Sequence, residues 1–193
     1  MDDKKKQGAG NRECELVERL QSGDFRAFDE IFELLRGKLL AFASRMTGDP
    51  RQAEDIVQES FIVLAQEIQS IRPEKGVSSW LFRVARNKSI DFIRRRKREF
   101  VPGDDFINAG KTGAVTAPEA GPDQRLISSE TRSRTAALLD RLAPEERELV
   151  VLRYYGGLTL AEISRVVRRP VTTVLWRLKR SLAGMRKAEN EMR

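Results

Sequence analysis

The chain has 193 residues, of which 40% are hydrophobic, so its length allows one ordinary domain or two small ones with packed cores and argues against disorder throughout. Lys and Arg number 36 against 29 Asp and Glu, and the resulting +7 favours a polyanionic partner. One cysteine, Cys14, and no histidine leave no means of building a disulfide framework or an ordinary zinc site, and no run approaches the roughly 18 apolar residues of a membrane span. We therefore expect a cytoplasmic protein with no zinc site and no membrane insertion.

The first apolar stripe predicts a helix that is capped by Asp24 and ends near Gly48. Its core-facing residues recur at steps of three and four and are Phe28, Ile31, Phe32, Leu35, Leu39, Phe42 and Met46. Asp49 followed by Pro50 predicts the start of the next helix, because an aspartate side chain accepts free amides and proline at the first helical position loses no hydrogen bond. The inner face of that helix is expected to carry Ala53, Ile56, Val57, Ser60, Leu64 and Ile68.

A third helix is expected to begin at Ser78 or Ser79 and to run through Trp80 into an arginine cluster. Residues 83–98 hold eight basic side chains and one acid, a net charge of +7 that equals the excess of the whole chain. A basic run of this kind is as often a solvated helix end as a nucleic-acid site. The pattern therefore predicts an all-α bundle of three or more helices over residues 12–98.

Residues 99–125 are rich in proline, glycine and small polar residues and predict a flexible linker. A second helical block follows over residues 126–190. Its first helix is expected at about 126–142, and a second helix is expected to start at Ala143 and Pro144 and to stop at Gly156 and Gly157. The chain is thus predicted to form two small helical domains.

The end of the second block has the spacing of a helix-turn-helix. Thr159 and Glu162 form an S/T-x-x-E capping box that opens a short helix, Leu160 to Val167. A break at 168–170 precedes a last helix from Val171 to about Lys187. A short helix, a tight break and a long basic helix are typical of DNA-binding modules, in which the second helix enters the major groove.

The last helix is expected to have one buried and one DNA-facing side. The predicted buried side consists of Val171, Val174, Leu175, Leu178 and Leu182. The predicted outer side offers hydrogen-bond donors, one aromatic ring and cations for bases and phosphates, from Thr172, Thr173, Trp176, Arg177, Lys179 and Arg180. An ordinary amphipathic C-terminal helix with a basic exterior is the alternative.

Asp55, Gln58 and Glu59 stand at i, i+3 and i+4 and would form one acidic and amide patch on a helix. By spacing alone, such a patch is more often solvent surface than a docking site, because the sequence shows no partner for it.

Four segments in this order resemble extracytoplasmic-function (ECF) sigma factors of bacterial RNA polymerase. They are Gln52–Phe61 (QAEDIVQESF), Trp80–Asn87 (WLFRVARN), Leu142–Tyr155 (LAPEERELVVLRYY) and Leu158–Ile163 (LTLAEI). The resemblance implies that the first domain is sigma region 2, which docks on core polymerase and melts the minus-ten element. It implies that the second domain is sigma region 4, which binds the minus-thirty-five element.

Carried over residue by residue, the resemblance assigns core polymerase docking to Asp55, Gln58 and Glu59. The melted non-template strand would lie along the helix from Trp80 to Arg98 and the loop 69–78, and the expected contacts are Trp80, Arg83, Arg86, Asn87, Lys88, Arg94 and Arg95. For Trp80 the alternative of a core residue is favoured, because an aromatic on an apolar helical stripe is more often core than a base wedge. The outer residues of the last helix would contact duplex promoter DNA. Because Leu175 and Trp176 depart from the family pattern there, the promoter sequence is not predicted.

By analogy with the family we also expect an anti-sigma partner, no cofactor and no catalytic residue, since the nucleotide chemistry would belong to core polymerase. Two alternatives remain at this stage. A stand-alone helix-turn-helix regulator would leave the patch of Asp55, Gln58 and Glu59 unexplained. A DNA-processing enzyme with a helix-turn-helix tail lacks metal-spaced carboxylates or a histidine base in the sequence.

Overall fold

The computed structural model describes the backbone of residues 2–99 and 129–191 and the side chains of 11–96, 98 and 134–191. These ranges are helical and contain no strand, which confirms the all-α prediction. The first part contains α1 (Asp2–Gln21), α2 (Arg26–Thr47), α3 (Pro50–Glu67), the 3-10 turns η1 (Ile68–Ser70) and η2 (Pro73–Lys75), and α4 (Val77–Glu99). The second part contains α5 (Ser129–Asp140), α6 (Pro144–Tyr154), α7 (Leu160–Val167) and α8 (Val171–Glu191). The predicted linker lies outside the described residues, apart from Glu99.

Local capping explains the end of α2 and the start of α3. The Asp49 carboxylate accepts the amides of Arg51 and Gln52 at 3.0 and 3.2 Å, and Pro50 opens α3 as expected. Gly48 ends α2 with a left-handed φ of 68°, and its amide donates to the Ser44 carbonyl. These two predictions are confirmed.

Asp24 does not act as the predicted N-cap of α2. α2 begins at Arg26 after Phe25, which makes no side-chain cap. One Asp24 oxygen accepts the Arg26 amide at 3.1 Å, and the other is bound by the Arg19 guanidinium at 2.7 and 2.9 Å. The aspartate therefore ties the α1–α2 turn to α1, and this hydrogen bonding to Arg19 holds the pKa of the Asp24 carboxyl below its ordinary value.

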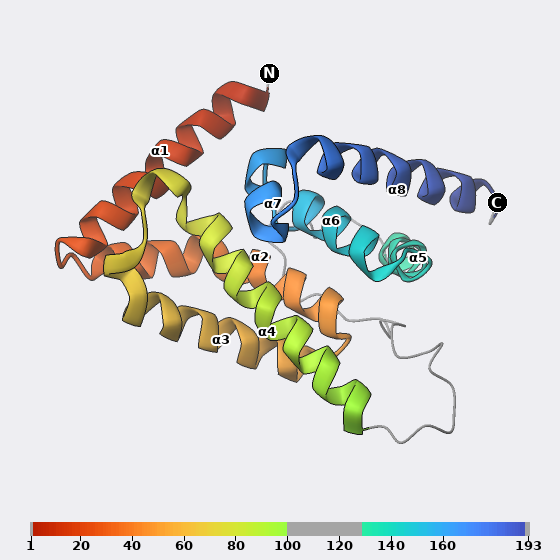
Figure 1. Cartoon of the computed structure of the whole chain (residues 1–193), viewed down its shortest axis with the longest axis horizontal. Helices are drawn as coiled ribbons and strands as arrows, with labels where there is room; N and C mark the ends of the chain where they lie inside the picture. Colours follow the sequence, from red (N-terminus) through yellow and green to blue (C-terminus); the bar gives the residue numbers. More distant parts are fainter. Residues whose placement is uncertain (1, 100–128, 192–193) are drawn as a thin grey trace.

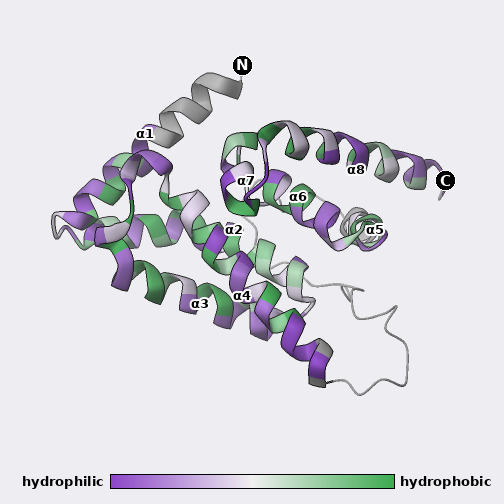
Figure 2. Cartoon of the chain, in the orientation of Figure 1, coloured by the Kyte–Doolittle hydropathy of each residue, from purple (hydrophilic) through white to green (hydrophobic). Residues whose placement is uncertain are grey.

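The first helix, α1, was not predicted from the sequence. Leu16, Val17 and Leu20 are buried on its inner side, at the i and i+4 spacing that amphipathic helices use. That spacing is present in the sequence, but it spans only about one and a half helical turns, which is too short to predict a helix by itself. The core of the first part forms where α2 packs on α1, α3 and α4, whose apolar residues are buried. Apolar and polar residues alternate along these helices (Figure 2). Phe42 and Phe82 meet edge to face in the core, with ring centroids 5.5 Å apart.

The second part is a helix-turn-helix. Thr159 Oγ1 accepts the Glu162 amide at 3.2 Å, and Glu162 accepts the Thr159 amide at 2.7 Å, so the predicted capping box is confirmed. The C-cap of α7 is Arg168, which has a φ of 54°, the left-handed conformation in which many helices end. α8 then runs one turn beyond the predicted end.

The buried side of α8 differs from the prediction at two positions. Val174 and Leu178 are buried and Leu182 is half-buried, but Val171 and Leu175 are 42% and 37% exposed. Both belong to the predicted apolar stripe, yet they lie at its edge, and the neighbouring helices α5, α6 and α7 do not cover them. An apolar stripe wider than the packed face explains the difference.

The two parts pack directly on each other. α4 lies against α7, and α2 lies against α6, so a single hydrophobic core runs through both parts (Figure 1). Two aromatic contacts join them: Arg45 of α2 lies 3.7 Å above the ring of Tyr155, and the Phe82 ring borders Gly156, where an added Cβ would lie 3.0 Å from it. The interface joins residues that are far apart in the chain, such as Arg45 and Tyr155, so no local sequence pattern predicts it.

Candidate nucleic-acid interface

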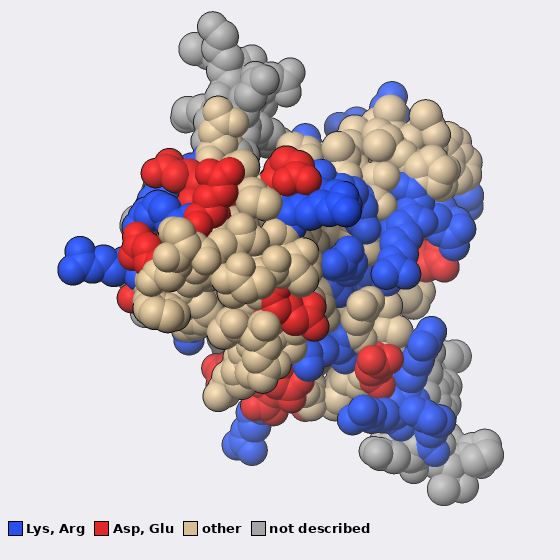
Figure 3. Space-filling view, turned by 60° about the vertical axis from the view of Figure 1, so that its left-hand side comes forward, with Lys and Arg blue, Asp and Glu red and all other residues tan. Residues whose placement is uncertain are grey.

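The predicted minus-ten residues follow one another along α4. Asn87, Arg94 and Arg95 are exposed, and Arg83 is half-buried. Arg96 and Arg98 are also exposed in the last turns of α4. In Figure 3, Lys and Arg side chains cluster at the lower right of the view and again above it on the right half, and a few Asp and Glu side chains lie beside these clusters. Such a cationic track can bind a nucleic-acid backbone.

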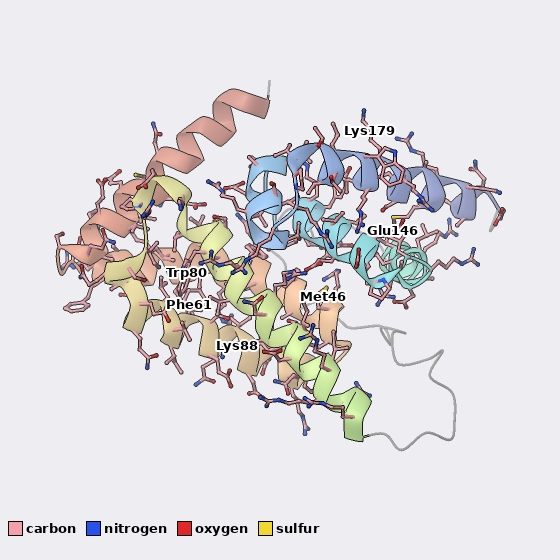
Figure 4. The ribbon with its side chains drawn as sticks, in the orientation of Figure 1. Met46, Phe61, Trp80, Lys88, Glu146 and Lys179 are labelled. Atoms are coloured by element: carbon pink, nitrogen blue, oxygen red, sulfur yellow. The ribbon has the colours of Figure 1, made fainter. Side chains whose placement is uncertain are left out.

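Trp80 lies at the start of this track and packs against the hydrophobic core, where it is half-buried. Figure 4 places it on α4, about two turns before Lys88. The burial agrees with a core role for much of the ring, since an aromatic on an apolar helical stripe usually packs inward.

Two basic residues of the track are already bound by carboxylates. Lys88 Nζ lies 2.5 Å from the Glu59 carboxylate. This ion pair links a predicted contact of the melted DNA strand to the predicted docking patch. Arg86 forms a fork-shaped ion pair with Glu148 of α6, through Nε to Oε1 and through Nη2 to Oε2, the latter at 3.3 Å. Glu148 is only 5% exposed, and its burial raises the pKa of its carboxyl in spite of the opposing effect of Arg86.

The loop before α4 is held by α1. Gln21 donates from its side chain to the carbonyls of Ile68 and Ile71 at 2.9 and 2.7 Å. Glu13 accepts the amide of Ser78 at 3.1 Å and its hydroxyl at 2.5 Å, so a carboxylate of α1 caps the N-terminus of α4. Burial raises the pKa of the Glu13 carboxyl. Sequence reasoning found neither residue, because these partners are 47 to 65 positions away.

The recognition helix α8 presents four of its six predicted residues to solvent. Thr172, Trp176, Lys179 and Arg180 are exposed, with Trp176 at 60%, and Lys179 lies on α8 in Figure 4. The Arg180 guanidinium lies 5.5 Å from the centre of the Trp176 ring, so these two side chains form one cationic and aromatic surface.

The other two residues of α8 face the neighbouring helices. Thr173 and Arg177 are half-buried and line a small hollow together with Arg86 and Glu148. Arg177 forms an ion pair with Glu145 of α6. The hollow therefore brings one predicted DNA contact of the first part, Arg86, and two of the second part, Thr173 and Arg177, against Glu145 and Glu148 of α6.

The patch on α3 is accessible. Asp55, Gln58 and Glu59 are all exposed, while the inner residues Ile56, Val57 and Ser60 are buried. A protein partner could reach the patch without any change in the helices.

Within the described ranges, His, Cys, Asp and Glu do not form any cluster of three or more that could hold a metal ion. The helices of these ranges also include none with the length and apolar character needed to cross a membrane.

Family models identify both parts of the chain. Residues 31–99 match the model of sigma-70 region 2, and residues 132–184 match that of sigma-70 region 4. These matches define the chain as a sigma factor of the sigma-70 class, a class of transcription regulators rather than of enzymes.

Similar individual proteins indicate which group of sigma factors the chain resembles. The chain is 31% identical over 176 residues to the ECF RNA polymerase sigma factor SigW of Bacillus subtilis, an alignment that spans 89% of this chain and 93% of the relative. Two solved structures share the fold. One is CnrH in complex with the cytosolic domain of CnrY, with a TM-score of 0.68, 21% identity, and coverage of 93% of this chain and 98% of that one. The other is RpoE in complex with the anti-sigma factor NepR from Bartonella quintana, with a TM-score of 0.66, 20% identity, and coverage of 86% and 98%.

The chain therefore belongs to the extracytoplasmic-function family of RNA polymerase sigma factors. The resemblance drawn from the sequence is confirmed, and so is the expected function in promoter-directed initiation. Because the first part matches sigma region 2, the stand-alone regulator no longer accounts for the chain.

Proposed function

We propose that this sigma factor divides its work between residues 12–98 and residues 126–190. The first unit would dock on core polymerase and hold the melted minus-ten strand, and the second would bind the duplex minus-thirty-five element. The observation that carries the proposal is that the chain has both a basic track on α4 and a helix-turn-helix, in which α7 begins with a complete capping box and the outer side of α8 is exposed.

Melting requires a site that binds unpaired bases better than paired ones, because lost stacking costs a few kcal/mol per step. The exposed Asn87 offers an amide to an extruded base, and Arg83, Arg94 and Arg95 supply charge for the backbone. Arg86 and Lys88 would join them once released from Glu148 and Glu59. Trp80 would contribute through its accessible edge.

Duplex DNA would be contacted by the outer side of α8. Thr172 and Trp176 would lie toward the base edges near the start of the helix, and Lys179 and Arg180 toward the phosphates. Thr173 and Arg177, which are half-buried in this structure, would flank them. Trp176 offers no acceptor and a large apolar surface, so it favours contact with thymine methyl groups.

Asp55, Gln58 and Glu59 would dock on core polymerase, which explains why a basic protein exposes an acidic patch on α3. An anti-sigma protein is the expected inhibitor, since one of the structural neighbours is a sigma factor bound to an anti-sigma factor. The protein would act in the cytoplasm, by binding alone and without a cofactor or catalytic residues of its own.

The decisive experiment is transcription in vitro with purified core polymerase, this protein and fragments of genomic DNA. Discrete transcripts that require both proteins are expected, and mapping their start points gives the promoter sequence. A polypeptide that neither joins core polymerase nor starts a transcript from any fragment would overturn the proposal.

A further inference from the structure

The ion pair between Arg86 and Glu148 joins a predicted DNA contact in the first part of the chain to a buried carboxylate in the second. The residues are 62 positions apart, and the pair forms only because α7 packs on α4 and α6 packs on α2. Both Nε and Nη2 of Arg86 donate to Glu148. A phosphate would use the same fork of donors, which Glu148 occupies in this structure.

We propose that Glu148 is an intramolecular competitor of DNA, which locks the two halves of the sigma factor in a closed state that withholds Arg86 from the promoter strand. The inference rests on the proposed function of α4. In the closed state the guanidinium has an anionic partner, and in the promoter-bound state the DNA would take its place.

Because Glu148 is buried, loss of this ion pair should weaken the packing of the two parts more than loss of an ion pair on the surface would. Glu148 is 5% exposed, and a buried carboxylate that loses its cation is left as an uncompensated charge. The closed state therefore depends on Arg86 staying in place. Phe82, which is fully buried, borders Gly156, and Arg45 covers the ring of Tyr155, so opening would also separate these contacts.

The other functional surfaces stay open in the closed state. Asp55, Gln58 and Glu59 are exposed on α3, and Lys179 and Arg180 are exposed on α8. Core polymerase could therefore dock before the halves separate. The closed state, in which Arg86 is paired with Glu148, would weaken binding of the single promoter strand by the free sigma factor. It would not prevent the sigma factor from assembling with core polymerase.

The test measures the separation of the halves in the full-length protein. Cys14→Ser removes the native thiol, and spin labels are attached after Gln66→Cys on α3 and Ala183→Cys on α8, both at exposed positions. Pulsed electron paramagnetic resonance of this parent should give one narrow distance distribution. Glu148→Arg, which sets two cations against each other, should give a broader and longer one.

Two further variants keep the test decisive. Glu145→Arg is the matched control, because it makes the same charge change one turn away on α6, where the side chain pairs with Arg177 rather than with α4. It should keep the narrow distribution. The swap Arg86→Glu with Glu148→Arg restores opposite charges and should restore it. A broad distribution in the parent, a narrow one in Glu148→Arg, or an open or unfolded swap would each overturn the proposal.

A binding measurement separates this inference from the proposed function. The probe is a short fluorescent single strand with the non-template sequence of a promoter mapped by transcription. If closed molecules outnumber open ones by about ten to one, Glu148→Arg should bind it about tenfold more tightly than Glu145→Arg. Opening without that gain would overturn the competition for Arg86. Failure of all variants to bind the strand, with the expected distances, would instead count against the function proposed for α4.

Discussion

Lys179→Ala gives a quantitative test of the recognition helix. Lys179 is exposed on the outer side of α8, eight residues after its first residue. At a rise of about 1.5 Å per residue it lies about 12 Å along the helix, where the second helix of a helix-turn-helix still runs close to the phosphates. We therefore expect the substitution to remove one phosphate contact.

The loss of one contact has a defined salt signature. The slope of log K against log salt concentration should become shallower by about 0.9. Between about 50 and 200 mM salt, the affinity ratio of parent to variant should then shrink about 3.5-fold. The assay is fluorescence anisotropy of polymerase holoenzyme on a duplex that carries the mapped minus-thirty-five element.

Lys187→Ala is the matched control, because Lys187 is also an exposed lysine and lies about two turns further along α8. It lies beyond the part of a recognition helix that approaches DNA, so its salt slope should equal that of the parent. Equal slopes for Lys179→Ala and the parent would refute the DNA-facing orientation of α8. Equal losses in both variants would show that the basic end of α8 acts only through its total charge.

Three further substitutions test other parts of the structure. Asp55→Arg should weaken co-purification with core polymerase at least tenfold by charge reversal, while Glu67→Arg, a charge reversal at an exposed position at the far end of α3, should have little effect; equal binding by both would remove the docking assignment. Thr159→Ala should lower the free energy of unfolding by about 1 kcal/mol, seen as a lower Tm, because it removes the N-cap of α7; an unchanged Tm would contradict that role. Glu13→Gln should flatten the pH dependence of Tm above the ordinary carboxyl pKa of 4.5.

The sign of the Glu13 effect follows from its raised pKa. Burial is the main cause, the bonds from Ser78 and the charge of Lys38 oppose it, and the charge of Glu162 adds to it. The folded state thus binds the proton more tightly than the unfolded chain, so this carboxyl favours folding less as pH rises from 4.5 through the raised pKa. Comparing Tm at about pH 5 and 7 checks this; an identical fall in parent and variant would refute it.

Short-range signals made much of this protein predictable. The start of α3 at Pro50, the capping box of Thr159 and Glu162, and the end of α2 at Gly48 each depend on residues within about four positions of one another. The inner stripes of α2 and α3 follow from helical periodicity for the same reason. The exposed acidic patch and the basic α4 track were found in this way, and only the family resemblance gave them partners.

Long-range packing decided the rest. No local signal marks Glu148 as a buried residue or names Arg86 as its partner, because both facts depend on α6 lying against the first part of the chain. The exposure of Leu175 and the capping of α4 by Glu13 are of the same kind. The sequence by itself determined most of the helical segments after α1, the local caps at Gly48, Asp49 and Thr159, and the family to which the chain belongs, since those properties arise within a helix turn or along a motif. Only the tertiary structure decided which faces of those helices meet, because burial depends on shape and area summed over residues far apart in the chain.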